Sequence, residues 1–161
     1  MKRDDLYIRR CIELSKKSLK DGELPFGSLI VKAGRIIAES ENRTKKDGDI
    51  TSHAEMVVIK KAQKVLSTQN LSDCTIYAST EPCPMCSFMI RELKFKKVVF
   101  AVHSPIMGGS SHFKILQDKR LEKIRNFYTK PPLIVGRVLE KEASKVWDEW
   151  RQKEHEKKIS L

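Results

Sequence analysis

The sequence has no long hydrophobic run and no segment typical of a secretory signal. Its longest apolar runs, such as 98–102, are far shorter than the ~20 residues that span a bilayer. The amino-terminal segment is charged and lacks the apolar core of a signal peptide. Repeats, linkers and low-complexity segments are also absent. We therefore expect no membrane partner and a cytoplasmic protein.

Cysteine is scarce, with four residues in the chain. Without an export signal, nothing favours the oxidising compartment in which disulfides persist. Cys11 falls on an expected helix and Cys74 opens an expected strand, so both are interpreted as small buried hydrophobic residues. Cys83 and Cys86 lie three residues apart, which is a spacing suited to a metal.

The composition indicates a globular protein. The chain has 161 residues, of which 40% are hydrophobic and 33% charged, and this predicts a single domain over residues 1–161. The net charge of +11 favours an anionic partner such as RNA. The lysines are nevertheless spread along the whole chain, and many basic proteins bind no nucleic acid, so the charge leaves both possibilities open.

Hydrophobic periodicity and turn residues predict alternating helices and strands. The expected helices cover 3–20, 51–66 (capped by Thr51 or Ser52), 83–94 and a basic carboxy-terminal segment at about 140–158, with a partly helical stretch at 113–127. The expected strands cover 26–32, 35–40, 74–79, 97–102 and 133–138. This alternation is typical of an α/β fold in which a central sheet has helices on both faces.

Two short motifs at helix starts predict a metal site. His53 and Glu55 form an H-x-E motif, and a P-C-x-x-C motif at 82–86 supplies Cys83 and Cys86. The positive end of a helix favours the thiolate form of cysteine, which is the form that binds zinc. One imidazole and two thiolates make three good ligands, and a catalytic zinc site keeps its remaining position for water.

Glu55 suits acid–base chemistry at such a site. We expect one Zn²⁺ per chain with a bound water or hydroxide, because the metal lowers the pKa of the water toward neutrality. Glu55 would take a proton from this water and deliver protons to a ring nitrogen and to a departing amine. A structural zinc site is the alternative, and it would require a fourth ligand, for which His103 and His112 are the candidates nearest in the sequence.

These residues resemble the cytidine deaminase-like superfamily of zinc enzymes, whose signature is H-x-E followed by P-C-x-x-C. The longer strings Pro-Phe-Gly at 25–27, Ser-His-Ala-Glu-Met at 52–56 and Glu-Pro-Cys-Pro-Met-Cys at 81–86 are similar to the branch containing bacterial tRNA adenosine deaminases and guanine deaminases. The similarity covers nearly the whole chain. It implies a three-layer α/β/α fold with a five-stranded mixed sheet, and a homodimer in which the partner often helps to close the active site.

The resemblance also assigns roles to individual residues. His53, Cys83 and Cys86 match the zinc ligands, and Glu55 matches the proton shuttle. The substrate contacts expected from it are Asn42, the backbone N–H of Ala54, and Phe26 in the base pocket. Phe26 as a core aromatic and Asn42 as a turn residue are the alternatives.

The loop after the fourth expected strand departs from both groups of relatives. The tRNA enzymes usually have an Asp-Pro-Lys pattern there, whereas this chain has His-Ser-Pro-Ile-Met from 103 to 107. The stretch 118–132 matches neither group. His103, His112 and Phe113 are candidate pocket walls, because histidine can donate to a base and an aromatic ring can stack on one. An exposed loop is the alternative.

The sequence therefore predicts a hydrolase that replaces the exocyclic amine of a nucleobase by a keto group and releases ammonia. The leading substrate is adenosine in tRNA. A free base or nucleoside (guanine, adenosine, cytosine or cytidine) is the alternative, and a non-catalytic zinc-stabilised RNA-binding subunit is a further one. Such inactive modules typically lose the glutamate, which is present here as Glu55.

Overall fold

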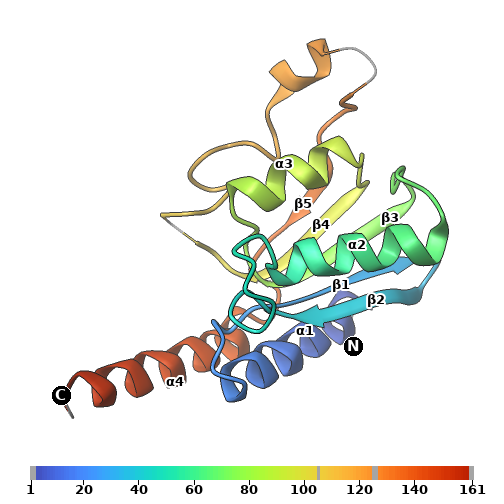
Figure 1. Ribbon diagram of the computed structural model, residues 1–161. Coiled ribbons are helices and arrows are strands. Elements are labelled where there is room, and N and C mark those ends of the chain that lie inside the picture. Colours follow the sequence, from blue (N-terminus) through green and yellow to red (C-terminus); the bar gives the residue numbers. More distant parts are fainter. Residues whose placement is uncertain (1–2, 105, 125–126, 160–161) are drawn as a thin grey trace.

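A computed structural model describes residues 3–104, 106–124 and 127–159 of the chain. Its centre is a five-stranded sheet with the order β2-β1-β3-β4-β5. The strands are β1 (Gly27–Lys32), β2 (Arg35–Glu41), β3 (Cys74–Thr80), β4 (Lys97–Val102) and β5 (Leu133–Val135). β1 pairs antiparallel with β2 and β3, whereas β3, β4 and β5 run parallel. The prediction of a five-stranded mixed sheet is confirmed (Figure 1).

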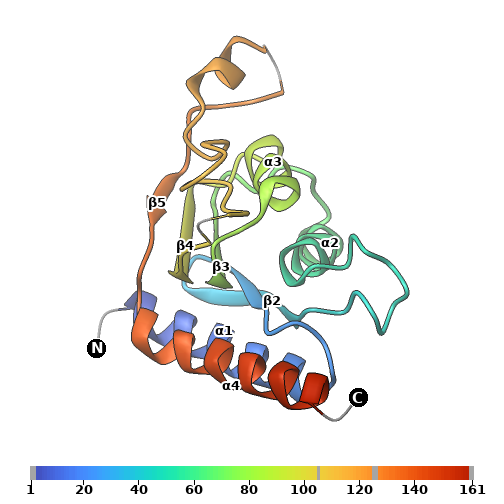
Figure 2. The same ribbon diagram turned by 90° about the vertical axis from the view of Figure 1, so that its left-hand side faces the viewer.

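Four helices cover the two faces of the sheet. They are α1 (Arg3–Lys20), α2 (Ala54–Leu66), α3 (Pro84–Glu92) and α4 (Glu140–Ile159). α1 and α4 lie side by side on one face, and α2 and α3 lie on the other (Figure 2). Successive residues of β3 pack against opposite helix layers: Ile76 lies in the core cluster under α2, and Tyr77 lies in the core cluster under α1. None of these helices combines the length and the apolar character that crossing a membrane demands.

Most expected elements form close to their predicted bounds, and the differences have local causes. α2 begins at Ala54 with His53 as its N-cap, so the prediction of Thr51 or Ser52 as the cap was wrong. The hydroxyl and N–H of Thr51 instead donate to Asp49 in the preceding turn. α3 ends at Glu92, and β5 is shorter than the predicted 133–138, since only three of its residues pair with β4.

The part of the segment between β4 and β5 that contains the 3₁₀ helix η1 (Lys119–Lys123) projects away from the sheet (Figures 1 and 2). The predicted helical character at 113–127 is therefore limited to one short element within its described part. Arg91, a fully buried residue of α3, holds the base of this segment. Its guanidinium donates to the backbone carbonyls of Ile115, Leu116, Asp118 and Thr129.

The parallel strands bring two loops to one edge of the sheet. β3 and β4 run parallel with Ala78 opposite Phe100 and Thr80 opposite Val102, so both chains leave the sheet at the same end. The loop after β3 leads into α3, and the loop after β4 returns over that helix start, where Gly109 N–H donates to the carbonyl of Pro82. A crevice at the carboxyl ends of parallel strands is the usual site of ligand binding in such sheets.

Candidate metal centre and active-site pocket

Two helix starts present the predicted metal ligands. His53 is the N-cap of α2 and Cys83 is the N-cap of α3, and both have extended backbone and no side-chain capping bond. Their side chains are therefore not used to satisfy the free N–H groups of the first helical turn. Pro84 occupies the start of α3, where the missing N–H costs nothing. The helix positions thus leave the imidazole and the thiol available for another partner.

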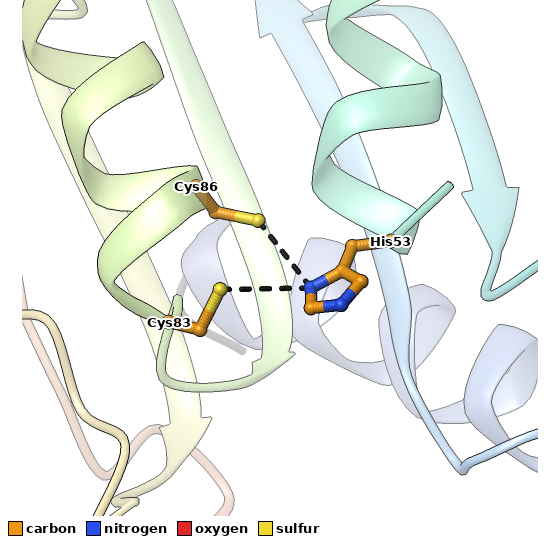
Figure 3. A group of neighbouring side chains, drawn as sticks. All are labelled: His53, Cys83 and Cys86. Carbon is orange, nitrogen blue, oxygen red and sulfur yellow. Dashed lines mark hydrogen bonds between the residues drawn. The ribbon is translucent and has the colours of Figure 1, made fainter. Parts of the chain in front are cut away.

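The three side chains converge on one point between the helices (Figure 3). His53 Nδ1 lies 3.6 Å from Cys83 Sγ and 3.7 Å from Cys86 Sγ. For zinc bonds of ordinary length, two ligand atoms of a tetrahedron are roughly 3.5 Å apart. The group therefore fits a zinc ion in its present geometry. Among the residues that the structure describes, no fourth Cys, His or carboxylate joins this group. His103, one candidate for closing a structural site, is instead bonded to Glu81.

Electrostatics divide the charge unequally within this cluster. A hydrogen bond from Cys86 and the nearby imidazole of His53 lower the pKa of Cys83 to about 4. Sharing that hydrogen bond, together with burial, raises the pKa of Cys86 well above its usual range. The thiolate of Cys83 in turn raises the pKa of His53. The site therefore holds a stable thiolate at neutral pH, and a divalent cation would favour the second one.

Glu55 lies in the same pocket although it is only two residues from His53. It is in the first turn of α2, and its side chain is buried beside Cys86, with which the carboxyl shares a hydrogen bond. Burial and the negative charge of Cys83 raise its pKa to about 7. A carboxyl group that titrates near neutrality can both accept and donate a proton. The helix start, rather than the spacing alone, places this group beside the metal ligands.

The pocket around the cluster is formed by the starts of α2 and α3, the residue just before β1, the last residue of β3, the loop after β4, and α4. It is lined by Phe26, His53, Glu55, Thr80, Glu81, Cys83, Ser104, Met107 and Trp147. Phe26 lies parallel to the imidazole of His53, with ring centroids 6.3 Å apart. The structure therefore brings four of the predicted site residues, including Phe26, into one cavity.

Other predicted contact residues lie elsewhere. Asn42 is buried next to Phe26, whose carbonyl accepts from the Asn42 backbone N–H; its side-chain amide donates to Glu23 and Thr44, and its Oδ1 has no hydrogen-bond partner among the described residues. His112 and Phe113 pack edge to face against each other, with Phe113 exposed, and neither lines the cavity. Ala54 is fully buried at the first position of α2. The substrate roles of these residues stay predictions.

Glu81 is a pocket residue to which the sequence analysis gave no role. Its side chain is completely buried, and its carboxylate accepts from the backbone N–H of Ser104 and Ser110 at 2.9 Å, and from the N–H and hydroxyl of Ser111. His103 Nδ1 lies 3.1 Å from the same carboxylate. These bonds lower the pKa of Glu81 against the opposing effect of burial. Glu81 thus ties down the loop that forms one wall of the pocket.

Two glycines allow this loop to approach so closely. A Cβ at Gly108 would collide with the Glu81 carboxylate and with Ser111, and one at Gly109 would collide with Ser87 of α3. The close packing therefore requires the Gly-Gly pair. Two sequence features indicated the role of Glu81: it directly precedes the P-C-x-x-C motif, and a glycine- and serine-rich stretch follows at 108–111. Hydrophobic periodicity could not link them, because these residues lie almost 30 positions apart.

Comparisons with known proteins agree with this geometry. Residues 1–102 match the family described as the cytidine and deoxycytidylate deaminase zinc-binding region. Over 121 residues the chain is 38% identical to the tRNA-specific adenosine deaminase of Bacillus subtilis (strain 168), covering 74% of this chain and 75% of the relative. It is 42% identical over 98 residues to the guanine deaminase of the same organism, covering 60% and 63% of the two chains.

A solved structure from a study of A-to-I editing by tRNA:A34 deaminases at the wobble position of transfer RNA has the same fold. It superimposes with a TM-score of 0.79 at 24% identity and covers 87% of this chain and 97% of that one. The predictions of a cytidine deaminase-like fold and of a hydrolase acting on carbon–nitrogen bonds are confirmed. Because the zinc-binding region of this family matches residues 1–102, which is more than half of the chain, this chain belongs to the cytidine and deoxycytidylate deaminase family.

Proposed function

We propose that this protein is a zinc-dependent hydrolytic deaminase whose substrate is adenosine in tRNA. One observation carries the proposal: His53, Cys83 and Cys86, whose ligand atoms lie within 4.8 Å of one another, meet beside the buried carboxyl of Glu55, and His53, Cys83 and Glu55 line the same pocket. A binding module that needed zinc only for folding would have no use for a carboxyl group there. The preference for tRNA rests on the relatives at 36–38% identity, which are named tRNA-specific adenosine deaminases.

His53, Cys83 and Cys86 would hold one zinc ion per chain. The ion, when bound, would lower the pKa of a water molecule so that hydroxide is available near neutral pH. Glu55 would accept the proton of the attacking water and transfer it to the ring nitrogen next to the reacting carbon. A second transfer through Glu55 would protonate the departing amine, so that water and amine become a keto group and ammonia. The burial of Glu55 suits both transfers, because it keeps bulk water from competing.

The remaining pocket residues would bind and orient the base. Phe26 would contact the flat face of the ring, and the Ala54 N–H would donate to it from the start of α2. The unpartnered Oδ1 of Asn42, whose backbone N–H donates to the Phe26 carbonyl, would be a buried acceptor for the base. His112 and Phe113, which lie outside the cavity, would contact parts of a larger substrate beyond the reacting nucleotide. Such contacts exist only if the substrate is a nucleic acid.

We further propose that residues 1–161 act as one deaminase domain, in the cytoplasm and as a homodimer. The net charge of +11 supports a polyanionic substrate, because each phosphate contact releases counterions. Guanine is the second candidate substrate. It is favoured by the 42% identity to a guanine deaminase and by the loop at 103–112, which lacks the Asp-Pro-Lys pattern.

The test is a substrate panel in which ammonia release is measured. The panel contains a tRNA anticodon stem-loop and the free compounds adenosine, adenine, guanine, guanosine, cytosine and cytidine. Turnover of the stem-loop alone is the expected result, and its rate should fall steeply as salt rises. Release from guanine alone would overturn the tRNA assignment. No release from any of them by the zinc-loaded protein would overturn the deaminase itself.

A further inference from the structure

Trp147 is the one lining residue that α4 contributes to the pocket, and nothing in the family match assigns it a role. The matched family region ends at residue 102, whereas Trp147 lies in the second turn of α4. Its side chain is half-buried and lines the cavity together with Phe26, Glu55 and Cys83. The last helix of the chain thus reaches the site that the first 102 residues build.

The indole of Trp147 is held in place from several sides. Its Nε1 donates to Thr80 Oγ1 at 3.0 Å, which ties it to the end of β3 just before the metal-binding loop. Its ring packs edge to face against the rings of Phe26 and Trp150, with ring centroids 5.3 Å and 5.6 Å apart. The hydrogen bond satisfies the only polar atom of the side chain, so the remaining ring surface is apolar. Trp147 is therefore a fixed aromatic surface and not a mobile side chain.

The helix that carries Trp147 is itself anchored. Ala143 and Val146, one turn and one residue earlier, are buried in the core beneath α1. Arg9 of α1 forms an ion pair with Glu142 at 3.1 Å. These contacts fix the helix register, and the register decides that residue 147 faces the pocket. The aromatic surface is thus in position before any substrate arrives, which lowers the entropy cost of binding.

We propose that Trp147 is a substrate-binding residue whose indole packs against the planar nucleobase or nucleoside in the pocket. The inference rests on the proposed function and goes beyond it by assigning part of the recognition to the carboxy-terminal helix of the same chain. Stacking on an aromatic side chain is tolerant of base identity, and its removal costs roughly five- to 150-fold in affinity. Trp147 would therefore strengthen binding without taking part in proton transfer.

The first test uses kinetics on the substrate that the parent enzyme turns over. Trp147→Ala is expected to raise KM about tenfold or more and to change kcat less than about threefold. Trp147→Phe keeps an aromatic face but loses the hydrogen bond to Thr80. Its KM should therefore lie between the KM of the parent and that of Trp147→Ala. Trp150→Phe is the matched control, because Trp150 touches Trp147 but does not line the pocket. An unchanged KM in a folded, zinc-loaded Trp147→Ala protein would overturn the inference.

The second test does not depend on activity. The chain contains two tryptophans, so Trp150→Phe leaves Trp147 as the single fluorophore. In the inactive background Glu55→Gln, adding the stem-loop or the preferred free base should change the Trp147 emission along a saturable binding curve. The matched variant Trp147→Phe, which retains Trp150, should show a much smaller change. Binding that is detected by fluorescence anisotropy of a labelled ligand but leaves Trp147 emission unchanged would overturn the inference.

The two failures are distinguishable. If the parent protein neither binds nor deaminates any member of the panel, the proposed function fails and this inference fails with it. If the parent is active but either test gives its overturning result, only this inference fails. The fluorescence test needs only the conservative substitutions Glu55→Gln, Trp150→Phe and Trp147→Phe, so it decides the matter even if Trp147→Ala does not fold.

Discussion

The pocket has two walls that use a buried glutamate in opposite ways. On the helix wall, Glu55 lies beside Cys83 and Cys86, and burial together with the negative charge of Cys83 raises its pKa to about 7. On the loop wall, Glu81 is just as buried, but donors from Ser104, Ser110 and Ser111 lower its pKa. The difference shows that burial alone does not decide the charge of a carboxyl group. The hydrogen-bond donors around Glu81 and the negative charge of Cys83 beside Glu55 move the two pKa values in opposite directions.

The largest effect is expected from removing one of the proposed metal ligands, Cys83. We expect Cys83→Ser to lose the bound zinc and all measurable deamination, because the hydroxyl replaces a thiolate of low pKa. Metal content by atomic absorption and ammonia release check this. Cys74→Ser is the control, since burial raises the pKa of that thiol to about 11 and its side chain bonds only Asp73 among the described residues. Equal zinc in both variants would contradict the assignment.

Removing the carboxyl of Glu55 isolates the proton carrier from the metal. Glu55→Gln should lower kcat by about 10²- to 10⁴-fold, the usual contribution of a general acid–base group. Its melting temperature should not fall, because a buried carboxyl with a raised pKa is replaced by a neutral group of the same shape. Zinc content should stay at the parent level. A variant that deaminates as fast as the parent would show that Glu55 carries no proton.

Glutamine in place of Glu81, on the loop wall, should lower the stability of the fold. Glu81→Gln replaces an oxygen acceptor by an NH₂ group that faces N–H donors, so we expect a loss of about 3 kcal/mol in the free energy of unfolding. Activity should fall less than in Glu55→Gln and mainly through KM, because Ser104 and Met107 of this loop line the pocket. Urea unfolding and steady-state kinetics measure the two effects. A stable Glu81→Gln protein with a large loss of kcat would reverse the two roles.

The smallest effect is a pH dependence of stability that arises from Glu81. Its pKa in the folded protein is below the ordinary value of 4.5, so folding favours the ionised form. The resulting stabilisation is present above pH 4.5 and is lost as the pH falls toward the lowered pKa of the folded state. The parent should therefore lose stability on acidification more steeply than Glu81→Gln. Urea unfolding at several pH values gives the two slopes, and identical slopes would show that Glu81 is not held ionised.

Much of the fold and the residue types of the candidate metal site were predictable from local patterns. The hairpin at Ala33-Gly34 forms because both residues take positive φ, at 48° and 78°, as a two-residue β-turn demands. Helical period located α1, and the motifs at 53–55 and 82–86 located the starts of α2 and α3, where His53, Cys83 and Cys86 come together. The cap of α2 was mispredicted because Thr51 hydrogen-bonds within the preceding turn, and such competition depends on backbone that local preference does not specify.

The sequence by itself determined the family and the candidate metal-binding group, because both are recognised from residue type and from the short spacing within two motifs. Only the tertiary structure decided what surrounds them. Glu81 and Ser111 are 30 residues apart, and Thr80 and Trp147 are 67 apart, yet each pair is hydrogen-bonded at the pocket. Strand order and helix register bring these residues together, and both are set by the packing of the whole core rather than by any local pattern.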